Sequence, residues 1–470
     1  MSAIRGIIAA AGYVPYRRLQ RSEIAKTFGS GGGKGTRSVA SFDEDTTTMG
    51  VEAARLAMAS TAVRPEALLF STADPAYLEK NNANTLHAAL RLDADTAAFD
   101  MGGSVRSGIG SLAFAMMSGH NTLVVHSDKR GGLPTSGDES QCGDGAAAIM
   151  VGEGDRVIAA LIGAATRTHE FIDRWRTPGD ARPRSWEERF GEIQYLPMAQ
   201  AAMAEALKRA ELSADQVDVT IVTGPHTRAV KALSGKLGAV KIADDRTMVI
   251  GQTGTAHAAL LLADVLEQAA PNQVIVVVQI CDGADVLVFR TTDAIATYRP
   301  ARSVATQIEH TADLAYGKFL SWRGQVHLEP PRRPEPNRIS ASISARTEDY
   351  KYGFVGSQDA SSQAPHLPPQ RVSREGGGLD EMSPLPMSDV LGTIATFTID
   401  RIAFSPSPPI AFAVVDFDNG ARLPVELCDV DTATLAMGDR VEMTFRRLFT
   451  ADGIHNYFWK ARPLRGEVSN

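Results

Sequence analysis

The sequence predicts an α/β protein of 470 residues with a smaller all-β domain at its C-terminal end. Two observations predict this class. Over residues 1–295, short apolar runs alternate with alanine-rich segments of helical periodicity, which is typical of a buried sheet covered by helices. Over residues 389–465, strand-like runs are separated by turns that contain Pro, Gly, Asp or Asn. At roughly 100–200 residues per domain, the length allows two to four domains.

Each element of the α/β part follows from its local pattern. Residues 51–59 have the spacing of an amphipathic helix. The short all-apolar runs predict buried strands at 67–72, 121–127, 146–152, 218–222 and 274–280. Residues 160–195 interrupt the alternation with two tryptophans, several arginines and prolines, and we expect an insertion or lid loop there.

The second part of the chain changes in composition. Residues 296–355 predict a helical and proline-rich connector, because 329–338 contain four prolines among charged residues. Residues 356–388 are rich in Gly, Ser and Pro and have little periodicity. About five strands over 389–465 predict a small barrel of the OB type.

Charge and composition exclude several classes of protein. The formal net charge is -7, so no basic excess is present for binding nucleic acid. No apolar run approaches the roughly 18 residues of a membrane helix, and the apolar stretch at the N-terminus is too short for a secretory signal. Three cysteines build no disulfide framework. We therefore expect a reduced, cytoplasmic protein with no nucleic-acid or membrane partner.

Residues 1–292 contain three recognisable motifs, of which the first two are the more specific. They are Ala-Gly-Tyr-Val-Pro-Tyr-Arg-Arg-Leu at 11–19, Asp-Glu-Asp-Thr-Thr-Thr-Met-Gly-Val-Glu-Ala-Ala at 43–54 and Gly-Asp-Gly-Ala-Ala-Ala at 143–148. With them the segment resembles the thiolase superfamily, nearest the 3-hydroxy-3-methylglutaryl-CoA synthases and type III ketoacyl synthases. The resemblance implies the duplicated five-layer αβαβα fold, coenzyme A as substrate or acyl carrier, and a homodimer or dimer of dimers.

Residues 313–464 carry a second resemblance. The matching stretches are Phe-Leu-Ser-Trp-Arg-Gly at 319–324, Thr-Ile-Ala-Thr-Phe-Thr-Ile-Asp-Arg at 393–401 and His-Asn-Tyr-Phe-Trp-Lys-Ala-Arg-Pro at 455–463. They are similar to the acyl-CoA-associated zinc-ribbon and OB-fold family, whose members are usually separate partners of thiolase-like proteins. Here the two are fused in one chain.

The zinc ribbon of this second family is altered. The family has two Cys-x-x-Cys pairs, a strong signal for tetrahedral zinc. At that spacing this chain has no thiol, and only the first of the four residues is a plausible ligand: Asp359, Ser362, Ser373 and Gly376. We expect no bound zinc, although the retained Pro-Pro-Gln-Arg-Val at 368–372 predicts that the shape of the ribbon survives.

The catalytic positions of the thiolase superfamily are also substituted. The cysteine, which a helix N-terminus activates in these enzymes, falls on Val105, and valine cannot be acylated. The histidine falls on Thr223, the third catalytic position on Gln252, and the synthase glutamate near Thr72. We therefore expect no condensation through a cysteine thioester.

Five residues are the candidates for catalysis in its absence. His226 and His257 follow the two substituted loops, where each is either a general acid–base or a residue that caps or packs its loop. Ser104 is either a nucleophile or a helix cap, and Cys142 is either a nucleophile or a small buried residue. Tyr195 either donates to an oxyanion or packs under the insertion.

Candidate binding residues are fewer. Arg106 at the start of the nucleophile helix either meets an anionic substrate group or reaches into solvent. Arg37 and Lys236 are candidates for binding the phosphates or pantetheine of CoA. Thr223 and Gln252 are expected to line the pocket as substituted family positions.

Three functions remain open. The first is a CoA-dependent enzyme that cleaves or forms a carbon–carbon bond in a β-keto acid or β-hydroxyacyl-CoA, of retro-Claisen or retro-aldol type, without a cysteine acyl-enzyme. The second is a non-catalytic subunit that scaffolds an active paralogue. The third is a 3-hydroxy-3-methylglutaryl-CoA synthase-like acyltransferase that uses Cys142 or Ser104.

Overall fold

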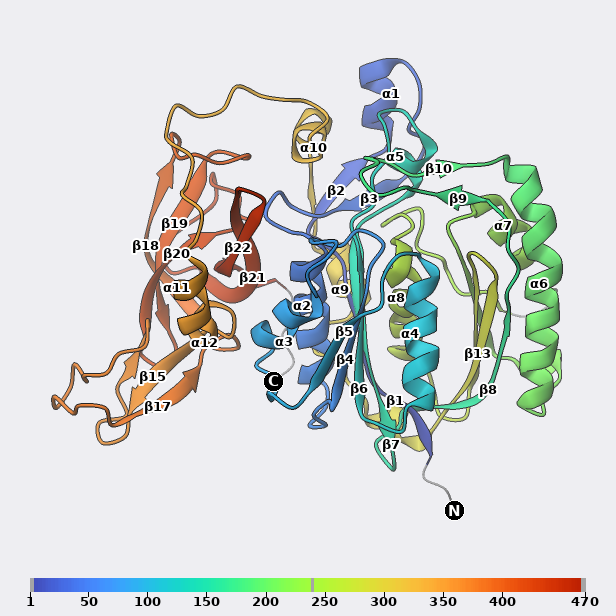
Figure 1. The fold of residues 1–470 in the computed structure, drawn as a ribbon, viewed down its shortest axis with the longest axis horizontal. Helices are drawn as coiled ribbons and strands as arrows, with labels where there is room; N and C mark the ends of the chain where they lie inside the picture. Colours follow the sequence, from blue (N-terminus) through green and yellow to red (C-terminus); the bar gives the residue numbers. More distant parts are fainter. Residues whose placement is uncertain (1–3, 238–240, 466–470) are drawn as a thin grey trace.

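The computed structural model of the chain describes residues 4–237 and 241–465, in which a β-barrel lies beside an α/β part (Figure 1). A nine-stranded mixed sheet runs through the α/β part in the order β11-β12-β13-β8-β1-β7-β6-β4-β5. Its strands are β1 (Arg5–Tyr13), β4 (Ala67–Ser71), β5 (Ala97–Asp100), β6 (Thr122–Asp128), β7 (Gly145–Glu153), β8 (Ala159–Arg167), β11 (Val219–Thr223), β12 (Val274–Ile280) and β13 (Ala284–Thr291).

Helices cover both halves of this sheet and also separate them. α2 (Thr46–Ala59) packs on β1, β6 and β7, with α3 (Ala83–Ala89) beside it. α6 (Glu188–Arg209) packs on β8 and β13, with α7 (Thr227–Lys236) beside it. α4 (Arg106–Met117) and α8 (His257–Leu266) contact strands of both halves (Figure 1). The predicted five layers, αβαβα, are therefore confirmed.

The central helix α8 shows why the sequence folds in this way. Its segment Ala258–Leu266 is apolar except for Asp264, and nearly every side chain is buried. A helix that is apolar on all sides is stable only when it is enclosed on all sides, as in the middle layer of this fold. Each predicted strand of the sheet lies within a residue or so of an observed one.

The expectation of an insertion at 160–195 requires a correction. Residues 159–167 form β8, which pairs with β1 and β13 inside the main sheet, because their run of Ala, Leu and Ile suits a buried strand. α6 already begins at Glu188. Only residues 168–187 leave the layers, and they contain a hairpin of β9 (Arg174–Trp175) and β10 (Arg184–Ser185).

The first part of the connector packs on the α/β part. β14 (Ala312–Asp313) extends a small sheet of β2 (Arg17–Gln20) and β3 (Thr36–Val39). α9 (Val304–Glu309) and α10 (Tyr316–Trp322) follow the same surface, together with α1 (Ser22–Phe28). Apolar side chains of these elements form a small core of their own: Leu19, Ile24, Val39, Leu314, Tyr316, Phe319 and Leu320. Residues 324–339 contain no helix or strand and lead across to the barrel.

Short helices α11 (Ala341–Arg346) and α12 (Glu348–Lys351) then lead into a three-stranded ribbon. Its strands are β15 (Val355–Asp359), β16 (Pro365–His366) and β17 (Met382–Pro386). The Asp359 carboxylate accepts hydrogen bonds from the amides of Ser361 at 2.7 Å and Ser362 at 3.3 Å. The hydroxyl of Ser373 and these amides lower the pKa of Asp359 to about 2. This carboxylate therefore ties together the two turns that carry zinc ligands in the family.

The predicted OB-type barrel is confirmed. It is closed in the order β18-β19-β20-β22-β21. Its strands are β18 (Gly392–Asp400), β19 (Ile410–Phe417), β20 (Arg422–Leu427), β21 (Arg440–Ala451) and β22 (Ile454–Pro463). Buried and exposed residues alternate along β20, as expected for a strand with one face in the barrel core. Phe354, Phe445 and Trp459 fill this core with mutually packed rings.

Buried ion pairs join the barrel to the α/β part of the same chain. Arg446, which has no exposed surface, pairs with Asp43 at 3.2 Å, Glu44 at 3.1 Å and Asp429 at 2.8 Å. Arg462 pairs with Glu52 at 2.8 Å. Buried charges are tolerated only with such complete pairing. The acidic motif at 43–54 is therefore a docking surface for the barrel.

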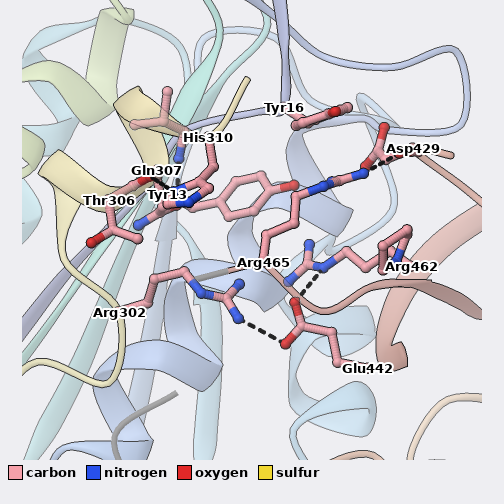
Figure 2. A pocket seen from close by; sticks show the side chains of 12 residues that line it. Tyr13, Tyr16, Arg302, Thr306, Gln307, His310, Asp429, Glu442, Arg462 and Arg465 are labelled. Carbon is pink, nitrogen blue, oxygen red and sulfur yellow. Dashed lines mark hydrogen bonds and ion pairs between the residues drawn. The ribbon is translucent and has the colours of Figure 1, made fainter. Parts of the chain in front are cut away.

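Figure 2 shows the edge of this interface, where a small cavity separates the two parts. Glu442 on β21 accepts hydrogen bonds from Arg302 and Arg462, each at 2.8 Å. Arg465 donates to the backbone carbonyl of Asp429 and lies over the ring of Tyr16. No helix of the described ranges is both long and apolar enough to cross a membrane.

Candidate active site

Helix α4 begins at the centre of the α/β part, where the cysteine of the resembled family falls on Val105. Val105 is the N-cap residue of the helix and is buried. Its carbonyl accepts a hydrogen bond from Gln279 Nε2 at 3.2 Å, which fixes the helix end against β12. A helix N-terminus presents unpaired N–H groups and a partial positive charge. In this chain the N–H groups of Arg106, Ser107 and Gly108 donate to Ser104 and to the Val105 carbonyl. Only the partial positive charge of the helix end is left to favour an oxyanion there.

Ser104 precedes this helix and is bonded on both sides. Its hydroxyl donates to Asp282 Oδ2 at 2.6 Å and accepts a hydrogen bond from the backbone N–H of Arg106 at 3.1 Å. The second bond satisfies one of the free N–H groups of the helix, which is the capping role. The bond to Asp282 places a carboxylate beside the Ser104 hydroxyl. A serine nucleophile needs such a neighbouring base.

The expectation that Arg106 meets an anionic substrate group is corrected by its partners within the chain. Its guanidinium pairs with the Asp285 carboxylate at 2.8 Å and donates to the Asp282 carbonyl at 2.6 Å. Asp285 raises the pKa of Arg106 although burial opposes this. The positive charge of Arg106 at this helix N-terminus is therefore balanced by Asp285 of β13. The guanidinium is not free to bind an anionic ligand.

His226 lies in a buried cluster with Asp173 and Tyr195. Nε2 of His226 is 3.8 Å from Oδ1 of Asp173, and the Tyr195 hydroxyl donates to Oδ2 of Asp173 at 3.0 Å. All three residues are buried. Burial raises the pKa of Asp173 although His226 and the Tyr195 hydroxyl bond oppose the rise. Gly191 of α6 makes room, because a Cβ there would lie 2.5 Å from Nε2.

The hydrogen bonds of His226 determine which proton it can transfer. Nδ1 accepts the backbone N–H of Ala229 at 3.1 Å, so the ring caps α7. A neutral ring in this arrangement carries its proton on Nε2. Nε2 is buried and has no hydrogen-bond partner among the described residues. His226 is therefore placed as a hydrogen-bond donor or acid, and Asp173 is the neighbouring base.

A continuous polar chain joins this cluster to the start of α4. The backbone N–H of Asp282 donates to the Tyr195 hydroxyl at 3.2 Å, while the Asp282 carboxylate holds Ser104. The chain therefore runs from Ser104 through Asp282, Tyr195 and Asp173 to His226. Tyr195 was expected as an oxyanion donor, but both of its bonds are internal, so it positions Asp173 and Asp282.

The two pocket-lining candidates have polar atoms without partners. Oγ1 of Thr223 and Nε2 of Gln252 are buried and make no hydrogen bond within the described residues. Oε1 of Gln252 accepts the Gly254 N–H at 2.8 Å, which orients its amide. The loops that carry them meet at Gln141, whose carbonyl accepts the Gln252 N–H and whose side chain accepts the Thr227 hydroxyl. Unpaired buried polar atoms are costly, so these mark a place for a ligand or bound water.

His257 begins α8, and its Nε2, like that of His226, is buried and makes no hydrogen bond within the described residues. Its Nδ1 accepts the Thr253 N–H at 3.3 Å, and the ring is 1% exposed. Burial lowers its pKa to about 4, against an opposing contribution from Asp245. The ring is therefore neutral near pH 7 and packs at the start of α8.

Cys142 lies under the hairpin of residues 168–187. Its Sγ is 4.0 Å from Oδ1 of Asp138, and Arg174 of the hairpin pairs with the same carboxylate at 2.8 Å. Arg176 of the hairpin pairs with Asp74 at 3.3 Å. The hairpin thus contacts loops on two sides of the candidate site.

Cys281, beside Asp282, has a raised thiol pKa because of burial.

The two cations proposed to bind CoA lie in very different places. Arg37 has no exposed surface, donates to the carbonyls of Glu139 and Arg130, and pairs with Asp144 at 3.4 Å. It is a structural residue behind the Gly-Asp-Gly turn, which corrects the expectation. Lys236 ends α7 and is exposed, with no contact to the polar chain.

Sequence reasoning missed Asp173 and Asp282, the two carboxylates of the polar chain. Asp173 lies in the irregular hairpin, and Asp282 lies in a tight turn after β12. Ser104 and Asp282 are 178 positions apart in the chain, so no local pattern joins them. The only available signal was an acidic residue directly after a buried strand, at the position of Asp282.

Comparisons with known proteins support the two parts separately. Residues 386–446 match the family model described as the C-terminal OB-fold domain of ChsH2. A hydroxymethylglutaryl-CoA synthase of Aeropyrum pernix is 29% identical over 343 residues, covering 68% of this chain and 94% of the relative. A hydroxymethylglutaryl-CoA synthase of Methanopyrus kandleri is 26% identical, covering 68% and 97%.

Solved structures show the same fold at lower identity. PksG, an HMG-CoA synthase from Bacillus subtilis, has a TM-score of 0.58 at 18% identity, covering 68% of this chain and 89% of that chain. MvaS in complex with 3-hydroxy-3-methylglutaryl coenzyme A has a TM-score of 0.57 at 19% identity, covering 72% and 95%. The chain thus has a thiolase-like fold that is similar to hydroxymethylglutaryl-CoA synthases, fused to an OB-fold domain.

Proposed function

We propose that this chain is an enzyme that cleaves or forms a carbon–carbon bond in a CoA thioester or β-keto acid without a cysteine acyl-enzyme. One observation carries the proposal: the start of α4 has valine in place of a thiol, yet a polar chain runs from it through Asp173 to a buried His226 Nε2 that makes no hydrogen bond within the described residues. The names of the relatives, hydroxymethylglutaryl-CoA synthases, support a CoA thioester as the substrate.

In the direction of aldol cleavage, Asp173 accepts the proton of the substrate's β-hydroxyl. The Cα–Cβ bond breaks, and its electron pair moves into the thioester as an enolate. The Nε2–H of His226 stabilises the enolate oxygen. A proton then returns to Cα, and the products are a carbonyl compound and a shorter acyl-CoA. A raised carboxyl pKa, as in Asp173, suits a base that works near neutral pH.

With a β-keto acid the same groups support a retro-Claisen reaction. The thiolate of free CoA takes the place of the missing protein thiol and adds to the β-carbonyl. The resulting oxyanion collapses with cleavage of the Cα–Cβ bond. The carbon that leaves as an enolate takes up a proton. Atoms balance in both cases with no further reactant.

A second candidate function rests on Ser104. Its hydroxyl lies 2.6 Å from the Asp282 carboxylate, so a serine acyltransferase has its nucleophile and base in contact. Incubation with acetyl-CoA followed by intact-protein mass spectrometry separates the two candidates. An acetyl adduct that Ser104→Ala abolishes would support the acyltransferase, and its absence supports the first proposal.

We also propose a homodimer, as the resemblance implies. β5 is an edge strand of the main sheet, and its Phe99 is 59% exposed. Met117 at the end of α4 is 75% exposed. An open edge strand with exposed apolar side chains suits pairing with a second copy. Light scattering of the purified chain measures the mass of the species in solution.

The test of the proposed function is a turnover screen of the purified chain. Short and aromatic β-keto acids and β-hydroxyacyl-CoA thioesters are offered with and without CoA, and products are identified by mass spectrometry. A shortened acyl-CoA or a released aldehyde supports the proposal. Binding of CoA thioesters without turnover would support the scaffold function instead.

A further inference from the structure

A cavity outside the candidate site lies where the connector passes the barrel. Its volume is about 710 Å³, within the range of small-molecule sites. One wall is the connector from Ser321 to Arg333, and the other is the loop 401–408 between β18 and β19. Neither segment contributes to the candidate active site.

The walls of this cavity are apolar and open to solvent. Leu328 and Ile402 line it and are 63% and 60% exposed. Phe404 and the prolines of both segments complete the lining. Exposed apolar side chains that face one cavity suit a ligand with a flat or apolar part.

Three arginines line the same cavity and are free of partners. Arg332, Arg333 and Arg401 are exposed, and none makes a hydrogen bond or an ion pair within the described residues. Other exposed arginines of the barrel are paired: Arg422 with Asp416 and Arg440 with Asp418. Among the lining residues only Glu329 is acidic. The cavity therefore has a positive rim and an apolar wall.

The connector links this cavity to the candidate site. Gln325 donates to the carbonyl of Gly132 at 2.6 Å, and Arg323 pairs with Asp144. Gly132 and Asp144 flank α5 (Gly137–Gln141) and Cys142, the segment that borders the site. The connector that forms one wall of the cavity is therefore also held against the segment around α5.

We propose that this cavity binds the nucleotide end of coenzyme A, with Arg332, Arg333 and Arg401 on its phosphates and the adenine against Phe404. The 3′-phosphate and the diphosphate supply the anionic groups that forked guanidinium donors bind best. The apolar wall supplies a stacking surface for the base. The inference rests on the proposed function, because it takes a CoA thioester as the substrate class.

The test measures binding of CoA and of adenosine 3′,5′-bisphosphate to the full chain by calorimetry. Wild type is compared with the triple variant Arg332→Ala, Arg333→Ala, Arg401→Ala. The matched control is Arg346→Ala, an exposed arginine on α11 that does not line the cavity. We expect both ligands to bind about tenfold or more weakly to the triple variant, and equally to wild type and control. Added salt weakens the binding to wild type more than to the triple variant.

Three results would overturn the inference. They are no binding of either ligand to wild type, equal binding to wild type and triple variant, and binding of decanoate but of no nucleotide. Phe404→Ala provides a second variant if the triple variant does not fold, and it should weaken adenosine 3′,5′-bisphosphate more than inorganic phosphate. Because this bisphosphate has no thiol and undergoes no turnover, its binding survives a failure of the proposed function.

Discussion

In two regions of this molecule the sequence predicts that the characteristic residues of the resembled families are replaced, and the structure of the two regions differs. At the four zinc positions of the ribbon, the Asp359 carboxylate takes up the amides of Ser361 and Ser362, so the turns keep their shape. In the loops that carry Thr223, His226 and Gln252, each of these side chains has a buried polar atom that makes no hydrogen bond within the described residues.

The two regions therefore differ in how the polar groups at these positions are satisfied. A buried polar atom without a partner costs stability in the free protein. The ribbon is not free of such atoms, because Nδ1 of His366 is one of them. A bound ligand or water that supplies the missing hydrogen bonds around Thr223, His226 and Gln252 would remove that cost.

The largest expected effect is on turnover. Asp173→Asn and His226→Asn should each lower it by about 100-fold or more, because they remove a base and an acid. Asparagine still accepts the Tyr195 hydrogen bond at 173 and still caps α7 at 226, so the melting temperature should change little. His169→Ala, an exposed histidine of the same hairpin, is the control. Full activity in both Asn variants would contradict the claim that the region around His226 is an active site.

The next effect concerns acid stability, where the two regions should respond in separate pH windows. Burial lowers the pKa of His126 to about 3 and of His257 to about 4, whereas unfolded histidine titrates near 6.5. The unfolded chain therefore binds more protons, and stability falls as pH drops from 6.5 toward 4, by on the order of 3 kcal/mol per ring.

The ribbon should lose stability only at lower pH. The pKa of Asp359 is held at about 2, so its contribution is complete above pH 4 and disappears as pH falls toward 2. Hydrogen exchange at pH 7, 5 and 3 measures both regions in one experiment. Simultaneous loss of protection at a single pH would contradict this separation.

Some features of the structure depend on residues close together in the chain, and others on residues far apart. Only the first kind could be predicted from the sequence. The strands, α2 and the barrel follow from patterns within a few residues, and they were predicted closely. The partners of Arg37 and Arg106 lie more than 100 positions away, at Asp144 and Asp285, so the sequence showed their charge but not its neutralisation. Distance also hid Asp282, which lies 178 positions from Ser104. Asp173 is only 22 positions from Tyr195 and was missed because its hairpin has no regular pattern.

A smaller effect is expected from removing the ribbon carboxylate. Asp359→Ala leaves the amides of Ser361 and Ser362 without their acceptor, and we expect hydrogen exchange in the ribbon to rise about tenfold. Turnover per folded molecule should stay unchanged, because the ribbon lies outside the candidate site. Ser383→Ala, an exposed residue of β17, is the matched control. Loss of turnover in Asp359→Ala would show that the ribbon takes part in function.

The smallest effect is expected at Cys142. If the reaction uses no protein thiol, Cys142→Ala should retain turnover to within about a factor of three, and iodoacetamide should not inactivate the wild-type chain. Inactivation that the substrate prevents and Cys142→Ala abolishes would instead support the acyltransferase function.

The most direct measurement of the central claim is exchange of α-hydrogens of an acyl-CoA in deuterated water, followed by mass spectrometry. Bond cleavage through an enolate requires the enzyme to return a proton to Cα, so the reverse step should introduce deuterium there without any second substrate. The account predicts deuterium uptake with the wild-type chain and none above background with His226→Asn or Asp173→Asn. Equal uptake by all three proteins, or none by the wild-type chain with its true acyl group, would contradict it.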